Sequence, residues 1–293
     1  MKKLINRKEN KIELSNQIVK IIIPILNPQN DFFTVLIPKL RNQTVKNEII
    51  LINSGQKIEE NPLYKVININ KKDFNHANTR NIALNYQADF YLFMTQDALP
   101  YDEKMIENLI LSFKKDDDIV VSYARQIPYE FSDEIEIFAR NKNYPKESLI
   151  KSKKDIDNLG IKTYFSSDSC AMYKVEYFTS VNGFEKDLNT NEDMHFAARA
   201  ILYDNKKISY EVNAKVYHSH KYNLATIFKR YLEIGKFFKE NSWIENSIKS
   251  TTQSGIKQAF EELVYILRNR PTLLFKSIIF SFVKFIAFKK GKN

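Results

Sequence analysis

A single carboxylate, Asp97, follows a short apolar run in the first half of the chain. Residues 91–94 are apolar and Pro100 ends the segment, which is typical of a buried strand followed by a turn. Asp97 is therefore expected at the carboxyl end of that strand, where open α/β sheets bind their ligands. A carboxylate there can bind a divalent cation together with phosphate oxygens and water. The alternative is a structural role in capping the turn.

Two asparagines and an arginine supply other polar groups that such a site needs. Asn27 and Asn53 each follow a predicted strand, so in a parallel sheet they lie at the same edge as Asp97. Their amides can hydrogen-bond a nucleotide base and ribose. Arg80 lies early in a predicted helix, where its guanidinium can bind a phosphate and the helix N-terminus also favours anions. These groups together predict a nucleotide site.

Strands alternate with helices through the first half of the chain, which predicts βαβ units and an α/β fold with a parallel sheet. Apolar and β-branched runs predict strands at 19–26, 48–52, 64–69, 91–94, 119–123, 207–212 and 214–220. Helices are expected at 31–40, 74–87, 102–114, 193–203 and 224–239. Residues 125–160 show no regular pattern.

Composition and charge narrow the class of protein. The 293 residues, 43% of them hydrophobic, suffice for one large domain with an appendage. The single cysteine excludes an internal disulfide and fits a reducing compartment, and no apolar signal-peptide segment follows the basic N-terminus. The net charge of +10 is concentrated in residues 1–20 and 249–293. Basic ends around a nearly neutral middle favour an anionic membrane surface over nucleic acid.

The last apolar stretch, residues 273–290, predicts an amphipathic helix in the plane of the membrane. On a helical wheel, Lys276, Ser277, Ser281 and Lys284 fall on one side and Phe275, Ile278, Ile279, Phe282, Val283 and Ile286 on the other. The segment is shorter and more charged than a bilayer-spanning helix, and its lysines can contact anionic headgroups. A core-facing helix and an oligomer contact are the alternatives. The chain then divides into a basic arm at 1–18, a main domain at 19–248 and a membrane-associating tail at 249–293.

Five short motifs occur in an order that resembles the family 2 glycosyltransferases, which have the GT-A fold. They are IIIP at 21–24, an Asn-Ser turn at 53–54, TRN at 79–81, FMTQD at 93–97 and NED at 191–193. The strings FNHANTRN at 74–81, MTQDA at 94–98 and VYHSH at 216–220 resemble the bacterial rhamnosyltransferase branch in particular. The resemblance covers about residues 18–240 and depends on the order of the motifs.

This resemblance implies a GT-A domain with a mixed, mostly parallel sheet, whose first half (19–100) binds a nucleotide-sugar donor and whose second half (101–248) binds the acceptor. It assigns to the donor Pro24, Asn27, Asn53, Arg80, Gln96 and Asp97. The family's Asp-X-Asp motif holds Mg²⁺ or Mn²⁺ against the diphosphate. Thr95 stands here in place of the first Asp, so Asp97 needs another metal ligand. His218 follows a strand at the place where related enzymes have a metal-binding histidine.

The resemblance also matches Asp193 to the general base, which takes the proton of the acceptor hydroxyl as that hydroxyl attacks. One base and no covalent step give inversion. Glu192 is expected to contact the acceptor or support the base, although an acidic pair can also serve only as favourable charge at a helix N-terminus. His76, Asp168 and His220 are further candidates for substrate contact, against structural roles in turns and packing. His218 and His220 share one face of their strand, which favours a role for the pair in binding a metal ion or a phosphate.

The sequence as a whole predicts an inverting glycosyltransferase at the cytoplasmic face of the membrane, with a homo-oligomer left open. The family likeness favours transfer of L-rhamnose from dTDP-rhamnose to a lipid-linked glycan precursor, and a UDP-sugar is the alternative donor. A nucleotidyltransferase is disfavoured because residues 27–30 are neither glycine-rich nor basic. A non-catalytic binding protein stays open because Thr95 and Asn53 depart from the family pattern.

Overall fold

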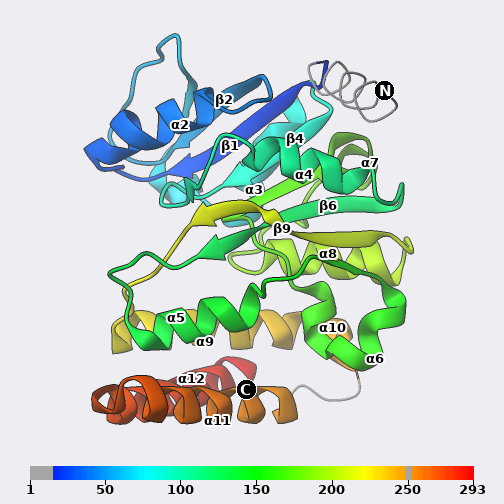
Figure 1. The fold of residues 1–293 in the computed structure, drawn as a ribbon. Helices are drawn as coiled ribbons and strands as arrows, with labels where there is room; N and C mark the ends of the chain where they lie inside the picture. The colour runs from blue at the N-terminus through cyan, green and yellow to red at the C-terminus, as the bar shows by residue number, and fades with distance from the viewer. Residues whose placement is uncertain (1–15, 249–251) are drawn as a thin grey trace, which may run out of the picture.

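A nine-stranded mixed sheet runs through the molecule in the order β3-β2-β1-β4-β8-β6-β9-β5, with β7 paired to β9 (Figure 1). It is seen in a computed structural model that describes residues 16–248 and 252–293, so nearly all of the predicted arm at 1–18 lies outside the described residues. The strands are β1 Val19–Ile25, β2 Asn47–Asn53, β3 Lys65–Asn68, β4 Phe90–Met94, β5 Leu99–Pro100, β6 Ile119–Ile127, β7 Leu149–Lys151, β8 Cys170–Lys174 and β9 Lys207–Tyr217.

Helices cover both faces of this sheet. They are α2 Ile37–Arg41, α3 His76–Asn81, α4 Met105–Phe113, α5 Glu134–Asn143, α6 Ile156–Leu159, α7 Val175–Ser180, α8 Glu192–Leu202, α9 Leu224–Glu240, α10 Ser242–Asn246, α11 Thr252–Asn269 and α12 Leu274–Lys292. A π-helical turn at Phe32–Leu36 precedes α2, and short 3₁₀ turns occur at Lys71–Asp73, Ile82–Asn85, Lys153–Asp155, Gly160–Tyr164 and Pro271–Leu273. The helices α2 and α4 share one hydrophobic cluster with the sheet, and α3, α7 and α8 share the other.

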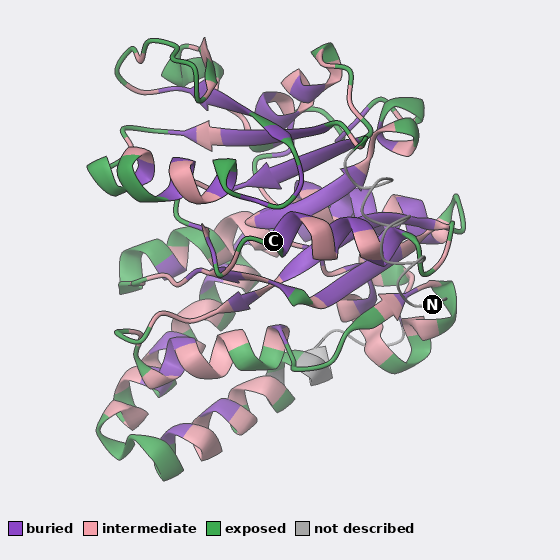
Figure 2. Cartoon of the chain, turned by 45° about the horizontal axis from the view of Figure 1, so that its top comes forward, coloured by how far each residue is buried: buried purple, intermediate pink, exposed green. Residues whose placement is uncertain are grey.

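The first half of the sheet forms as the sequence predicts. The strands β3, β2, β1 and β4 are parallel, so their carboxyl ends meet at one edge. Successive side chains of a strand point to opposite faces, and accordingly Ile21 and Ile23 join one hydrophobic cluster while Ile22 joins the other. Figure 2 shows these central strands as buried. Pro24 is tolerated in β1 because the pairing with β4 ends at Ile22.

The second half of the sheet is mixed. The strand β8 is antiparallel to β4 and β6, and β5 and β7 are antiparallel to β9, whereas β6 and β9 are parallel. The predicted α/β fold with a mixed sheet is thus confirmed, and its continuous parallel part lies in the first half. The strands predicted at 207–212 and 214–220 form one strand, β9, whose register against β6 shifts between Ala124 and Arg125. A register shift of this kind changes the direction in which the following side chains point.

Helix α5 lies in the segment that showed no regular pattern in the sequence. Its N-cap is Asp133, whose side chain accepts a hydrogen bond from the Glu136 N–H. Helix α11 was also not expected, and it packs on α5, where the Tyr265 hydroxyl donates to Glu134 Oε2 at 2.8 Å. These two helices, with α9 and α12, form the lower layer of the molecule in Figure 1.

Helix α12 is packed closely against α9. A Cβ atom added at Gly235 would lie 2.3 Å from the Phe288 carbonyl oxygen, and one added at Gly291 would lie 2.1 Å from the Leu232 carbonyl oxygen. Only glycine allows the two backbones to approach this far. The tail is therefore built onto the main domain.

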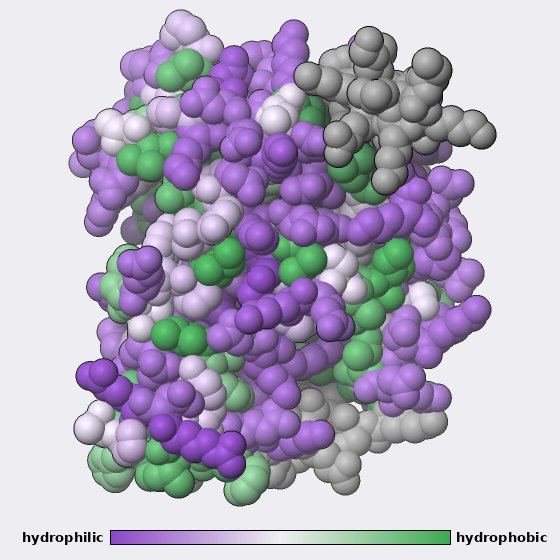
Figure 3. Space-filling view, in the orientation of Figure 1, coloured by the Kyte–Doolittle hydropathy of each residue, from purple (hydrophilic) through white to green (hydrophobic). Residues whose placement is uncertain are grey.

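Helix α12 turns large apolar side chains outwards and polar side chains towards the protein, where Phe280 and Ala287 are also buried. Its polar side faces the protein: Ser277 is fully buried and its hydroxyl donates to Glu262 Oε1 at 2.6 Å. Its apolar side faces outwards, with exposed side chains at Phe275, Ile278, Phe282, Phe285 and Ile286. Figure 3 shows hydrophobic residues along the lower edge of the molecule, over α11 and α12.

Two expectations about this tail need correction. By length and composition alone, the helix at residues 271–292 could cross a membrane, with a mean hydropathy of 1.6 over its apolar 18-residue window, whereas the sequence interpretation took the segment as too short and charged. The lysines expected to face lipid headgroups lie instead on the inner side, where Lys276 binds Asp133 Oδ2 at 2.6 Å and Lys284 lies 3.8 Å from Glu262 Oε2. The close packing on α9 holds the helix along the protein in this arrangement.

Candidate active site

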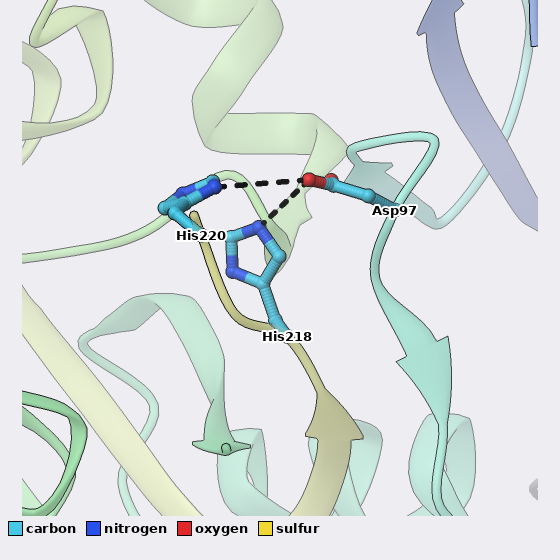
Figure 4. A group of neighbouring side chains, drawn as sticks. All are labelled: Asp97, His218 and His220. Carbon is cyan, nitrogen blue, oxygen red and sulfur yellow. Dashed lines mark ion pairs between the residues drawn. The ribbon is translucent and has the colours of Figure 1, made fainter. Parts of the chain in front are cut away.

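Asp97, His218 and His220 form a group that can hold a metal ion (Figure 4). Asp97 follows β4, and both histidines follow β9, so strands from the two halves of the chain bring the three together. Asp97 Oδ2 lies 3.3 Å from His218 Nε2 and 3.9 Å from His220 Nδ1. One ligand atom from each residue lies within 4.8 Å of the others. A carboxylate and two imidazoles are suitable ligands for a divalent transition metal.

The tautomer of His218 is set by Gln126 on β6. The Gln126 side chain is oriented by its own donation to Ser167 Oγ at 2.8 Å, which leaves its Oε1 2.8 Å from His218 Nδ1. The Nδ1–H therefore donates to Gln126, and Nε2 carries the lone pair. This Nε2 is buried and makes no hydrogen bond. A buried nitrogen without a partner, aimed at a carboxylate, fits a metal ion between the two.

The protonation states of Asp97 and His220 also suit metal binding. Burial alone would raise the pKa of Asp97, but the neighbouring His218 and His220 hold it below its usual range, so the carboxylate is ionised. Burial lowers the pKa of His220 to about 3, and the nearby Arg140 guanidinium acts in the same direction, so its imidazole is neutral at pH 7. Metal ions require ligands in these deprotonated forms. The sequence offered His220 both for acceptor contact and, on the face shared with His218, for a metal or phosphate role, and the structure places it beside Asp97.

Asp193 lies at the start of α8, and two backbone groups orient its carboxylate. Its Oδ1 accepts the Met194 N–H at 2.7 Å, and its Oδ2 accepts the Asp168 N–H at 3.3 Å. Burial and the nearby Glu192 carboxylate raise its pKa to about 6, and the two N–H groups oppose that rise. A carboxylate with a pKa near neutrality is well suited to accept a proton from a hydroxyl.

Arg80 does not lie where the sequence interpretation placed it. Its guanidinium is buried and bound between Glu192 Oε1, 2.9 Å from Nη1, and Asp168 Oδ2, 3.3 Å from Nε. His76 Nδ1 lies 3.3 Å from the same Nη1. Because both carboxylates already engage it, Arg80 is not free to bind a diphosphate. It holds Asp168 and Glu192 beside Asp193, and His76 belongs to the same cluster.

The polar residues at the ends of β1, β2 and β4 bind one another. Asn53 donates to the Gln56 carbonyl at 2.6 Å and to Asn68 Oδ1 at 2.8 Å, and its Oδ1 accepts the Gly55 N–H at 3.0 Å. Asn27 adopts a left-handed conformation with φ of 44° and accepts the Gln56 N–H at 3.0 Å.

Gln96 links β4 to β1 by accepting the Leu26 N–H at 2.8 Å. Asn27, Asn53 and Gln96 are thus brought to one edge, but the amides of Asn53 and Gln96 are occupied. These two residues shape the loops of this edge.

A pocket of about 530 Å³ opens beside the metal group and the base. It is lined by Asp193, His218 and His220, and by residues of α5, α9 and α12. None of the donor residues predicted in the first half lines it, so it belongs to the second half of the chain. A pocket of this volume is typical of a site for a small molecule or one end of a larger one.

Sequence reasoning missed Gln126, Arg230 and the three α12 residues Lys276, Phe280 and Lys284, of which the last four line this pocket. Gln126 could have been found by extending the strand at 119–123 by two further alternations, because β6 continues to Ile127. Arg230 gives no signal beyond its place on a predicted helix. The α12 residues were assigned to a separate tail.

Comparison with known sequences gives consistent results. The model of glycosyl transferase family 2 matches residues 20–181. The O-antigen chain rhamnosyltransferase RfbN of Salmonella typhimurium strain LT2 is 35% identical over 284 residues, which cover 94% of this chain and 90% of that protein. The O-antigen chain rhamnosyltransferase WbaN of Salmonella anatum is 34% identical over 281 residues, covering 93% and 89%.

Solved structures share the fold. The mannosyltransferase PcManGT from Pyrobaculum calidifontis, solved with GDP-Man and Mn²⁺, matches with a TM-score of 0.59 at 10% identity, covering 99% of this chain and 95% of that one. GalNAc-T7, solved with UDP, GalNAc and Mn²⁺, matches with a TM-score of 0.54 at 14% identity, covering 71% and 44%. The Asp97 group fits the divalent metal seen in such structures. The chain belongs to glycosyl transferase family 2 and is a glycosyltransferase.

Proposed function

We propose that the protein transfers L-rhamnose from dTDP-rhamnose to a lipid-linked glycan precursor, with inversion at the anomeric carbon. The observation that carries this proposal is the arrangement of Asp193 and the Asp97 group around one pocket. The rhamnosyl assignment is supported by the two relatives at 35% and 34% identity, which are both O-antigen chain rhamnosyltransferases. No residue of the pocket by itself identifies the sugar, so a UDP-sugar is the second candidate donor.

The proposed reaction is a single displacement. The acceptor hydroxyl oxygen bonds to the anomeric carbon of the donor sugar while the bond from that carbon to the phosphate oxygen breaks. Asp193 takes the hydroxyl proton, and its two backbone donors keep the carboxylate pointed at the acceptor. Arg80 keeps Asp168 and Glu192 in place beside it. One base and no second nucleophile give inversion.

Asp97, His218 and His220 would hold a divalent cation, Mn²⁺ or Mg²⁺. When bound, such an ion neutralises the charge that builds on the departing diphosphate. The two imidazole ligands favour Mn²⁺ over Mg²⁺, which prefers oxygen ligands. The non-catalytic alternative, raised by Thr95, loses its support because His218 and His220 replace the missing carboxylate as ligands.

We further propose that the enzyme acts at the cytoplasmic face of the membrane, with the main domain at 19–248 and the tail at 249–293 working as one body. The exposed apolar side of α12 supports this location, because five large apolar side chains in water would otherwise cost free energy. A helix lying in the interface would place the pocket beside a lipid-linked acceptor.

A donor screen tests the function directly. Purified full-length protein is given dTDP-rhamnose, UDP-GlcNAc, UDP-glucose or UDP-galactose, each with Mn²⁺, Mg²⁺ or chelator, and donor turnover is followed. We expect preference for dTDP-rhamnose, dependence on metal, and loss in Asp97→Ala but not in Asp187→Asn, an aspartate outside the pocket. Preference for a UDP-sugar would contradict the rhamnosyl assignment and leave the mechanism in place.

A further inference from the structure

Three basic side chains from two helices line the pocket that also contains Asp193. Arg230 belongs to α9, and Lys276 and Lys284 belong to α12. Arg140 and Lys221 line the same pocket. Its five cationic residues therefore outnumber its three carboxylates, which belong to Asp133, Glu136 and Asp193. The pocket wall formed by α9 and α12 therefore attracts anions.

Arg230, like Lys221, makes no hydrogen bond or ion pair with a described residue. Its guanidinium carbon lies 5.9 Å from the centroid of the Tyr222 ring. Arg140, in contrast, binds Glu136 at 2.7 Å. An exposed guanidinium in a pocket, with its five donors free of carboxylates, is well suited to bind a phosphate in bidentate fashion.

The two lysines keep donor capacity in addition to their present partners. Lys276 Nζ contacts Asp133 at 2.6 Å, which uses one of its three N–H groups. Lys284 Nζ lies 3.8 Å from Glu262 Oε2, which is longer than a hydrogen bond. The packing of Gly235 against α12 fixes both lysines relative to Arg230.

We propose that Arg230, Lys276 and Lys284 bind the phosphate group of the acceptor, so that α12 forms part of the acceptor site. The proposal deepens the transferase function and rests on it. A lipid-linked glycan carries its phosphate between the lipid and the first sugar. The same order is present here: the exposed apolar side of α12 comes first, then the basic wall on its inner side, then the base Asp193.

A binding experiment separates this site from the donor site. The probe is farnesyl diphosphate, a soluble isoprenoid diphosphate, with farnesol as the same chain lacking phosphate. The affinity of the full-length protein is measured for the wild type, for the double variant Arg230→Gln/Lys284→Gln, and for a control, Lys229→Gln/Lys290→Gln. The control changes two exposed cations of the same helices that do not line the pocket.

We expect the double variant to bind farnesyl diphosphate about tenfold to hundredfold more weakly, because hydrogen bonds to a charged group are lost. Its affinity for farnesol, for dTDP with Mn²⁺ and for phosphatidylglycerol vesicles should match that of the wild type. The control should bind farnesyl diphosphate normally.

Three results would overturn the proposal. An equal loss in the control would mean that overall charge, not this site, attracts the anion. A loss of dTDP affinity would assign Arg230 to the donor, and a parallel loss of vesicle binding would assign the cations to membrane headgroups. Because none of these measurements needs sugar transfer, failure of the wild type to use any donor would refute the proposed function separately.

Discussion

At the scale of residues, the metal group explains how the site works without the first aspartate of the family motif. Thr95 replaces that aspartate, and His218 and His220 approach the remaining Asp97 from the other half of the chain. The group depends on a residue that cannot itself contact the ion: Gln126 accepts the Nδ1–H of His218 and leaves Nε2 free. Gln126 is therefore a positioning residue.

Replacing Gln126 tests this dependence. We expect Gln126→Leu to weaken Mn²⁺ binding about tenfold to hundredfold, which is typical for removal of the partner of a metal-binding histidine. Electron paramagnetic resonance of free Mn²⁺ measures the affinity. Gln126→Glu, which keeps an acceptor oxygen, should retain most of it. Equal Mn²⁺ affinity in Gln126→Leu and the wild type would contradict the assigned tautomer.

The pKa of Asp193 predicts the pH dependence of catalysis. Burial and Glu192 raise this pKa to about 6, and a general base works only in its ionised form. The value of kcat should therefore rise with pH, reach half of its maximum near pH 6, and level off above it. The measurement is kcat at saturating donor and metal across this range. A rate that stays constant down to about pH 4.5 would show that a group of ordinary carboxylate pKa limits the reaction.

At the scale of elements, the contact between α9 and α12 determines whether the pocket is complete. The two glycines at the contact have no room for a methyl group, and the inner side of α12 supplies Lys276, Phe280 and Lys284 to the pocket. A helix that looks like a detachable tail in the sequence is thus a wall of the candidate active site.

Gly235→Ala tests the packing. The added methyl group would overlap the Phe288 carbonyl, so we expect the free energy of unfolding to fall by about 1–3 kcal/mol, as in other overpacked sites. Chemical denaturation measures this change. The matched control is Gly255→Ala in α11, where no atom lies within 4 Å of the added methyl group. This control should be neutral or stabilising by about 1 kcal/mol. Equal stability of the two variants would mean that α12 does not pack on α9 as described.

At the scale of the whole molecule, one face is built for an apolar environment. Five large apolar side chains of α12 are exposed, whereas Lys276, Ser277 and Lys284 face the protein. The exposed lysines Lys289 and Lys290 lie in its last turn. This exposed apolar side supports the proposed position of α12 at the lipid interface.

The double variant Phe282→Ser/Phe285→Ser tests that environment. Removing two exposed aromatic rings should weaken binding to phosphatidylglycerol vesicles at least about tenfold, since less apolar area enters the lipid. Co-sedimentation with vesicles gives the affinity, and turnover of a soluble donor should be unchanged. Leu63→Ser, which alters an exposed apolar residue of the first half, is the control. Undiminished vesicle binding by the double variant would contradict the membrane-facing role of α12.

Much of this molecule could be predicted from local patterns. The parallel strands β1 to β4 and the position of Asp97 follow from short apolar runs and their end residues. Helix α8, predicted from Asp193, begins one residue earlier at Glu192. The resemblance to the family also assigned His218 to the predicted metal site. What local patterns could not give is which partners satisfy a polar side chain: Asn53 and Arg80 look free in the sequence, but they are bound by Gln56, Asn68, Asp168 and Glu192.

Contacts between segments that are distant in the sequence could not be predicted either. The pairing of α12 with α9 depends on backbone approach at two glycines that are 56 positions apart, and neither has a distinctive neighbourhood in the sequence. The helical wheel separated Lys276, Ser277 and Lys284 from the exposed apolar residues of α12, but it could not tell which side faces the protein. It also put Val283 with the outer residues, although Val283 packs against a core cluster. Arg230 and the α12 lysines could be assigned to the pocket only from the structure, in which α9 and α12 both line it.

The most direct test of the central claim is the rate of rhamnose transfer from dTDP-rhamnose by the wild type and by Asp193→Asn, with dTDP affinity measured on both. The amide keeps the size of the side chain but cannot take a proton. We expect the variant to bind dTDP with Mn²⁺ as the wild type does and to transfer rhamnose about 10²–10⁴ times more slowly, the usual contribution of a general base. Transfer by Asp193→Asn at a rate close to that of the wild type would contradict the assignment of Asp193 and, with it, the proposed mechanism.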